Sequence, residues 1–256
     1  MIMDDELALE LGARILGSVG GIFVNADGYK KSIPGPGIGN YLTVGKAMGI
    51  ARAIMGEKSL RERTQMFAHG TGTQQNRTTE SHVLNEMAKA FGVDNWPVCA
   101  IKAYVGHSLG PAGGDQLAAI LGTWQYGWMP GITTVDHVAD DVHDSNLNFA
   151  LSHLQIDPHD MEGAFINSKG FGGNNATGFF LSPGYTTHML TQRWGEKKMN
   201  AWRHRNEAVV STAIDYDERA DGGDFPPIYQ LGEGVVESED LEISPGEIRI
   251  PGFGHS

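Results

Sequence analysis

The chain has 256 residues, of which 40% are hydrophobic and 20% charged, and this composition is that of a globular protein. Its formal net charge of −12 argues against nucleic acid or anionic lipid as a bulk partner, and no run of about 18 apolar residues indicates a membrane span. The acidic start does not resemble a signal peptide and a single cysteine excludes an internal disulfide framework, which together predict a cytoplasmic location.

The first elements become clearer along the chain. Residues 5–13 have helical character, whereas residues 14–24 read better as a β run interrupted by glycines. The stretch "NADGYKKSIPGPGIGN" at 25–40 is rich in turn formers and predicts a loop. Residues 41–56 carry apolar side chains at helical spacing and predict a helix.

From residue 64 on, apolar runs typical of strands alternate with helical patterns. The first helix of this region can be capped by Thr78 or Thr79 and would end at Gly92. The alternation indicates an α/β domain, in which ligands bind beyond the ends of strands. The expected elements are a strand at 64–68, a helix at 78–92, a strand at 96–105, a buried helix at 110–127, a third strand at 163–170 and a return strand at 174–184.

The composition changes after residue 184. Residues 186–210 can form an amphipathic helix, and the acidic, turn-rich residues 215–256 read as an arm that lies on something larger. We therefore predict one α/β domain at 1–184, followed at 185–256 by a helix and an extended arm.

Two histidines stand shortly after predicted strands, each beside a glycine-containing loop. Two neutral imidazoles that face one point, here His69 and His107, can each present an N–H to one carbonyl oxygen and so stabilise an enolate or oxyanion. Lys102 lies five residues before His107. We expect it to pair with a carboxylate such as Glu80 and to hold the rings neutral and oriented.

Hydroxyl and glycine residues near the histidines can bind a substrate. Thr71 and Thr73 can hydrogen-bond an amide-bearing ligand arm, and "KGFGGNN" at 169–175 offers backbone N–H groups for one wall of an oxyanion hole. Taken singly, a histidine after a strand is more often structural, and "GFGG" usually serves packing. The combination of three such loops favours a site.

Two other kinds of site have weaker support. The stretches "GPGIGN" and "GFGGNN" both lack the last glycine of a dinucleotide-binding fingerprint. A metal site is also not predicted, because no pair among the remaining histidines has helical ligand spacing with a defined third ligand. The histidines considered are His137, His143, His153 and His159.

Three motifs carry a family resemblance. "HGTGT" at 69–73, "KAYVGHSLGPAG" at 102–113 and "NSKGFGGNNA" at 167–176 occur in this order and resemble the three C-terminal motifs of the β-ketoacyl synthases. These are the decarboxylating condensing enzymes of the thiolase superfamily. The resemblance, which covers about residues 1–184, implies the C-terminal half of a thiolase-like fold: a mixed five-stranded sheet packed between helix layers, here with a C-terminal extension.

The resemblance implies a role for each motif residue. His69 and His107 would support decarboxylation of a malonyl thioester and hold its enolate, with Lys102 as the lysine of the family. Phe171 would be the gating aromatic whose backbone N–H completes the oxyanion hole, and Glu80 matches the acid eleven positions after the first histidine. The implied substrate-binding residues are Thr71 and Thr73, for a phosphopantetheine arm, and Gly170 and Gly172 in the glycine loop.

Three residues depart from the family pattern. Gln74 stands where proline is usual, Arg77 where an aspartate is usual, and Lys169 where the family has an aromatic residue. These changes bear on acyl-chain preference and loop rigidity more than on the reaction.

The nucleophile of such an enzyme is an activated thiolate, which the family places on a sharp turn of the N-terminal half. Cys99 lies inside a predicted strand and reads as a buried core thiol. We therefore expect a companion N-terminal half, either cut off from this chain or supplied as a separate polypeptide, and a homodimer as in the family.

The implied activity is that of a β-ketoacyl-[acyl carrier protein] synthase in fatty-acid or polyketide synthesis. It would use acyl carrier protein as a partner and no bound cofactor, because the thioester arm belongs to the substrate. The alternative is a non-catalytic ketosynthase-like partner or scaffold. The missing nucleophile favours that alternative, whereas the retained His69, Lys102, His107 and Phe171 argue against it.

Overall fold

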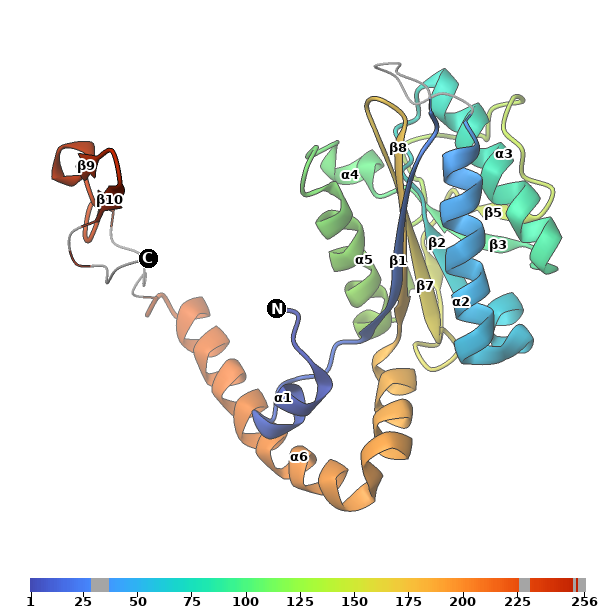
Figure 1. The fold of residues 1–256 in the computed structure, drawn as a ribbon. Helices are drawn as coiled ribbons and strands as arrows, with labels where there is room; N and C mark the ends of the chain where they lie inside the picture. Colours follow the sequence, from blue (N-terminus) through green and yellow to red (C-terminus); the bar gives the residue numbers. More distant parts are fainter. Residues whose placement is uncertain (29–36, 226–230, 251, 253–256) are drawn as a thin grey trace. The chain divides into compact units, whose positions relative to one another are not determined.

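The chain divides by its contacts into a compact unit, residues 1–207, and a second unit, residues 208–256. The predicted domain division after residue 184 stays a prediction. The computed structural model (Figure 1) describes residues 1–28, 37–225, 231–250 and 252.

The first unit is built around one mixed sheet of six strands in the order β1-β8-β7-β2-β3-β5 (Figure 1). The pairs β1–β8 and β8–β7 are antiparallel, whereas β7, β2, β3 and β5 run parallel to one another. This confirms the predicted α/β class and mixed sheet, with the short edge strand β5 in addition to the five expected strands. The strands are β1 (Ser18–Ala26), β8 (Asn174–Leu181), β7 (Gly163–Gly170), β2 (Thr64–Phe67), β3 (Trp96–Cys99) and β5 (Leu147–Phe149).

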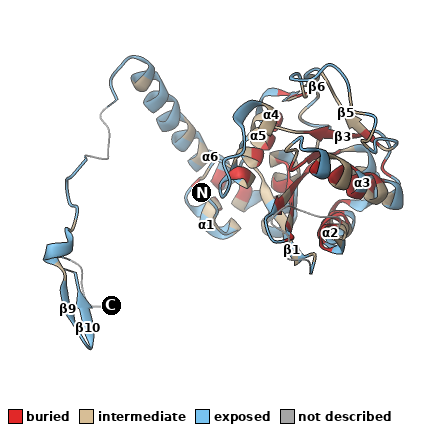
Figure 2. Ribbon diagram, turned by 90° about the horizontal axis from the view of Figure 1, so that it is seen from above, coloured by how far each residue is buried: buried red, intermediate tan, exposed pale blue. Residues whose placement is uncertain are grey.

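Helices cover both faces of this sheet. α2 (Ile38–Glu62) and α3 (Gln74–Phe91) lie on one face, and α5 (Ala112–Tyr126) lies on the other (Figures 1 and 2). Because the central strands are covered on both sides, all four residues of β2 are buried, including the polar Thr64 and Gln65, and burial does not alternate along the strand.

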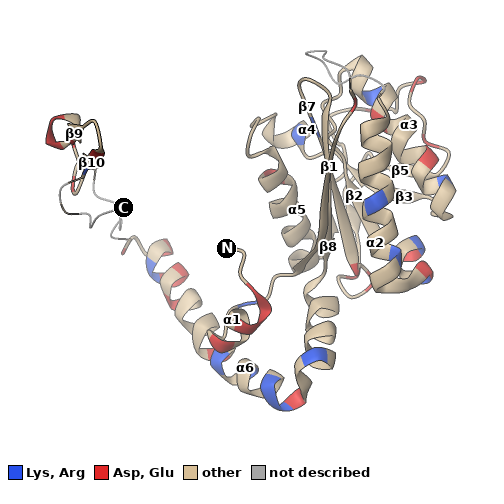
Figure 3. Cartoon of the chain, in the orientation of Figure 1, with Lys and Arg blue, Asp and Glu red and all other residues tan. Residues whose placement is uncertain are grey.

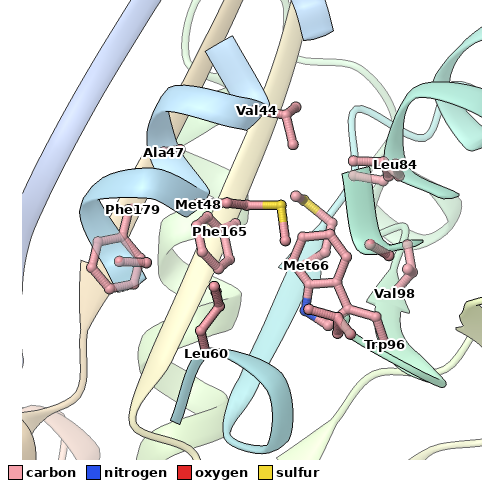
Figure 4. Packing of buried hydrophobic residues seen from close by; sticks show 14 of the residues in the cluster. Val44, Ala47, Met48, Leu60, Met66, Leu84, Trp96, Val98, Phe165 and Phe179 are labelled. Carbon is pink, nitrogen blue, oxygen red and sulfur yellow. The ribbon is translucent and has the colours of Figure 1, made fainter. Parts of the chain in front are cut away.

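The larger core lies between the sheet and the helices α2 and α3 (Figure 4). Trp96 and Phe165 meet edge to face there, with ring centroids 5.5 Å apart, and Met48 and Leu84 are buried beside them. Each such side chain stabilises the fold by roughly 1.5–3 kcal/mol through burial. A second core, which includes Phe67, lies under α5.

The helix predicted at 78–92 begins earlier than expected. α3 starts after Thr73, and the hydroxyls of Thr78 and Thr79 donate to carbonyls one turn back instead of capping the helix. The prediction of a cap at these threonines is therefore wrong. The predicted end is confirmed, because Gly92 closes the helix in the left-handed conformation at φ 68°.

The strand predicted at 96–105 is shorter than expected. β3 ends at Cys99, and residues Lys102–Val105 form one helical turn, α4, before the loop that carries His107. The apolar run continues past Cys99, so periodicity alone could not place this end. Of the predicted loop at 25–40, residues 29–36 lie outside the described part of the chain.

The first helix packs against the long C-terminal helix within the first unit. α1 (Asp5–Glu10) carries acidic residues that meet a basic stretch of α6 (Pro183–Asp221), as Figure 3 shows. Lys198 Nζ lies 2.9 Å from a Glu6 oxygen, and the indole of Trp194 donates to Asp5. The remaining elements are β4 (Trp128–Met129), β6 (Leu154–Gln155), η1 (Ser238–Asp240), β9 (Glu242–Ser244) and β10 (Glu247–Arg249).

Candidate active site

The structure brings the two predicted histidines together. His69 follows β2 by two residues, and His107 lies in the loop after α4, so both come from the carboxyl ends of neighbouring parallel strands. Their ring centroids are 5.1 Å apart and the ring planes meet at 81°. His69 is buried, whereas His107 is exposed, so the pair has one inner and one outer member.

Backbone amides fix which nitrogen of each ring carries the hydrogen. The amide of Lys169 donates to Nδ1 of His69 at 3.3 Å, and the amide of Leu109 donates to Nδ1 of His107 at 3.1 Å. A neutral imidazole whose Nδ1 accepts a hydrogen bond carries its hydrogen on Nε2. Both rings therefore keep an Nε2–H donor available for a third group.

Both rings are held in the neutral form. Burial lowers the pKa of His69 to about 4. The carboxylate of Glu80 opposes this shift, and the ammonium groups of Lys102 and Lys169 add to it, as would a proton on His107. The pKa of His107, which is only slightly desolvated, is also lowered, first by that desolvation and then by the charge of Lys102. At neutral pH the two rings are thus hydrogen-bond donors without charge, which is the state that the predicted oxyanion role requires.

Glu80 organises the turn that carries His69. One of its carboxylate oxygens accepts from the amide of His69 (2.7 Å) and from Asn167 (2.7 Å), and the other accepts from the amide of Gly70 (2.9 Å) and from Asn76 (3.0 Å). Each oxygen therefore accepts two hydrogen bonds, which fills the acceptor capacity of a carboxylate. This buried carboxylate ties the loop after β2 to α3 and β7.

The structure does not pair Lys102 with Glu80, so that expectation is wrong. The ammonium of Lys102 is buried and has no hydrogen-bond partner among the described residues. The oxygens of Glu80 already accept four hydrogen bonds, and Lys102 interacts with that carboxylate through its charge and not through a hydrogen bond. Burial lowers the pKa of Lys102, and the charges of Glu80 and Asp115 oppose the shift.

The predicted gating residue, Phe171, and the predicted substrate-binding residues lie at the surface. Phe171 is 73% exposed at the tip of the β7–β8 hairpin, where Gly172 adopts φ 82° and the side chain of Asn174 donates to the Phe171 carbonyl. Gly170 at the end of β7 is also exposed. The two threonines after His69 are accessible, with hydroxyl oxygens 3.4 Å apart: these are Thr71 and Thr73.

Cys99 is fully buried in β3, as expected. Burial raises the pKa of its thiol to about 12, so the thiol stays protonated at neutral pH. Because the thiolate is the reactive form, this environment is the opposite of the one that activates a nucleophile. No other cysteine occurs in the sequence.

Gln116 is a site residue that the sequence patterns did not reveal. It is fully buried on α5, and its amide nitrogen lies 2.7–3.2 Å from the carbonyl oxygens of Phe67, Ala68 and Asn167. It thereby fastens the ends of β2 and β7, which carry His69 and the glycine loop, to the helix that follows His107. The available signal was a glutamine within an apolar helical stripe.

Other features of the described residues bear on the kind of site. Across the described ranges, no three His, Cys, Asp or Glu side chains are placed to hold a metal ion together. The described helices include none that is both long and apolar enough to cross a membrane. Arg77, which departs from the family pattern, makes a bidentate pair with Asp141 at 2.7 and 2.9 Å.

Comparisons with known proteins agree with the motifs. Residues 16–136 match the family model of the β-ketoacyl synthase C-terminal domain. The chain is 49% identical over 253 residues to the β-ketoacyl-[acyl-carrier-protein] synthase FabY of Pseudomonas aeruginosa, a match that covers 99% of this chain and 40% of that protein. It is 27% identical over 222 residues to the fatty acid synthase alpha subunit stcJ of Emericella nidulans, covering 81% of this chain and 14% of that one.

Solved structures give the same result for the fold. The crystal structure of the noncanonical ketosynthase FabY from P. aeruginosa matches with a TM-score of 0.86 and 49% identity, covering 99% of this chain and 39% of that one. The ishigamide ketosynthase/chain length factor matches with a TM-score of 0.56 and 26% identity, covering 70% and 41%. The chain thus spans about two fifths of FabY and of the ishigamide protein, and it carries the C-terminal domain of a β-ketoacyl synthase on a thiolase-like fold.

Proposed function

We propose that the chain is the histidine-bearing part of a β-ketoacyl-[acyl carrier protein] synthase. The observation that carries this proposal is the pair of neutral rings, His69 and His107. Their ring centroids are 5.1 Å apart, and each ring has an Nε2–H group available as a donor. Two such donors can bind one thioester oxygen. The enzyme would act in fatty-acid or polyketide synthesis in the cytoplasm.

The proposed reaction begins with decarboxylation of a malonyl thioester. As the bond to the carboxylate breaks, CO₂ leaves and the electron pair enters an enolate, whose oxygen accepts hydrogen bonds from the two rings. The enolate carbon then attacks an acyl thioester held on a cysteine, and the thiolate leaves. In this scheme the backbone N–H of Phe171 binds the oxyanion of the second step, with Gly170 and Gly172 shaping the turn.

The substrates and partners follow from this scheme. Thr71 and Thr73 would hydrogen-bond the phosphopantetheine arm by which acyl carrier protein delivers the substrate, and no bound cofactor is needed. Because the thiol of Cys99 is buried and protonated, we propose that the nucleophile comes from a companion N-terminal half. We call this chain together with that companion the natural assembly, and we propose that two copies of this pair form a homodimer.

The test is release of CO₂ from a malonyl-carrier thioester by the natural assembly. Removal of one oxyanion donor costs about 10²–10³-fold in rate, so His107→Ala should reduce decarboxylation by that factor. His137→Ala is the matched control, because His137 is exposed and its side chain bonds to the neighbouring Asp136, away from the proposed site. Undiminished decarboxylation in His107→Ala would refute the assigned role.

The same assay addresses the alternative function. A non-catalytic ketosynthase-like partner is favoured by the absence of an activated thiol in this chain. If the unmodified natural assembly releases no CO₂ and forms no condensation product, the scaffold function replaces the enzymatic one.

A further inference from the structure

Lys169 is a buried lysine whose burial is not explained by any hydrogen bond among the described residues. Its side chain is only 5% exposed, and its ammonium has no hydrogen-bond partner among the described residues. Burying an unpaired ammonium is costly, so the position calls for an explanation. The lysine also replaces the aromatic residue that the family resemblance led us to expect there.

The position of Lys169 in β7 determines what its side chain meets. Residues two apart in a strand point to the same face, so Lys169 points to the side of the sheet on which Asn167 meets Glu80 and Asn40. Lys169 also pairs across the hairpin with Asn175, whose amide donates to Asp27 at 2.8 Å. Its ammonium therefore lies on the side of the sheet where Glu80 and Asp27 are the nearby carboxylates.

Charged and titratable groups approach His69 from four elements. Glu80 comes from α3 and holds its oxygen 2.7 Å from the His69 amide, so that by itself it would favour a protonated ring. Lys102 comes from α4, His107 from the loop after it, and Lys169 from β7, and each disfavours that proton. Burial is the largest cause of the lowered pKa of His69, and the two ammonium groups add to it by offsetting the one carboxylate.

We propose that Lys169 is a positioning residue of the condensing site: its backbone amide orients His69, and its buried ammonium offsets the charge of Glu80 so that the ring stays uncharged. This inference rests on the proposed function for its catalytic consequence, but not for its electrostatic one. Asp27 and Glu80 are the carboxylates that act on Lys169 itself.

The direction of the effect follows from the protonation states. Burial lowers the pKa of Lys169, yet His69 titrates only in acid, where the lysine still carries its proton. Removal of the ammonium leaves Glu80 less opposed, so the pKa of His69 rises above about 4, while burial, the largest cause of the lowering, and Lys102 still hold it below its ordinary value. Decarboxylation, which needs the neutral ring, should then fail at a higher pH than in the unmodified protein.

The experiment compares three variants of the natural assembly labelled with ¹³C-histidine. In Lys169→Met, which keeps the amide and a side chain of similar length, the His69 signal should titrate at higher pH and the acid limb of CO₂ release should move in the same direction. Lys169→Leu repeats the test in case the first variant does not fold. Lys58→Met removes an exposed lysine of α2 and should change neither measurement. The His69 signal is identified with His69→Gln.

The outcomes separate this inference from the proposed function. An unchanged His69 titration in both Lys169 variants overturns the inference, even if CO₂ release by the unmodified assembly supports the function. A raised His69 pKa in an assembly that never releases CO₂ keeps the electrostatic role and rejects the reaction. A loss of rate that is uniform across pH, with His69 titrating as before, would show a merely structural role for Lys169.

Discussion

Among single residues, Cys99 shows most directly how the environment decides chemistry. A thiol with a pKa of about 12 has a thiolate fraction on the order of 10⁻⁴ at pH 8. We therefore predict that iodoacetamide does not modify Cys99 in the folded natural assembly and modifies it readily in urea. Peptide mass mapping would distinguish this cysteine from any in the companion half.

A substitution at the same residue completes that prediction. Cys99→Ser removes the thiol but leaves the β3 backbone, so condensation should be nearly intact, although the buried hydroxyl weakens the fold by about 1–3 kcal/mol if it finds no partner. Rapid alkylation of Cys99 in the folded assembly, together with loss of condensation in the serine variant, would mean that this thiol is the nucleophile after all.

At the scale of elements, strand ends and turns position the histidines. Gly70 lies in the turn after β2, where there is little room for a side chain. It adopts φ 55°, and a Cβ there would lie 2.7 Å from Cβ of Ala100. Gly70→Ala should push the loop that carries His69 away from the end of β3. A misplacement of about 1 Å can cost about 10²-fold in rate, and we expect a loss of that size in CO₂ release.

The next glycine of the same loop provides the control. Gly72 also has a left-handed backbone, at φ 70°, but a Cβ there would meet nothing within 4 Å. Gly72→Ala therefore carries the same backbone cost, about 1–2 kcal/mol, without the collision. Equal losses of CO₂ release in the two alanine variants would show that backbone strain, and not crowding against Ala100, governs this loop.

The sequence was sufficient for elements whose signals are local. The strand at 163–170 was predicted with its true bounds, and the glycine that closes α3 was identified, because an apolar run and a left-handed cap are both local features. The start of α3 and the end of β3 were not, since each depends on contacts made elsewhere in the fold.

The candidate site divides in the same way. Its histidines were recognisable from their motifs, and their proximity follows from parallel strands that end at one edge. The carboxylate contacts of Glu80 and the clamp made by Gln116 join residues that are far apart in the chain. Such pairings have no local signature, and for the same reason the expected pair of Lys102 with Glu80 was wrong.

At the scale of the whole molecule, the fold leaves one face of the edge strand β1 exposed. Phe23 of β1 packs into the core under α2, so its neighbours Ile22 and Val24 point to the other face, beside α5. These side chains are 60% and 71% exposed. Neighbouring exposed apolar side chains on one face of a sheet are typical of an interaction surface, and we expect the companion half to cover them.

A charge introduced on this surface should have different effects in the natural assembly and in the chain on its own. Burial of an isoleucine is worth about 2 kcal/mol, so Ile22→Lys should lower the melting temperature of the natural assembly and weaken its association at least tenfold. In the chain on its own the same change should reduce binding of a hydrophobic dye and self-association, because the lysine is solvated there. Ile2→Lys, at another exposed apolar residue, is the control. If Ile22→Lys leaves the assembly as stable as the unmodified form, this face is open to water in the assembly and the companion must bind elsewhere.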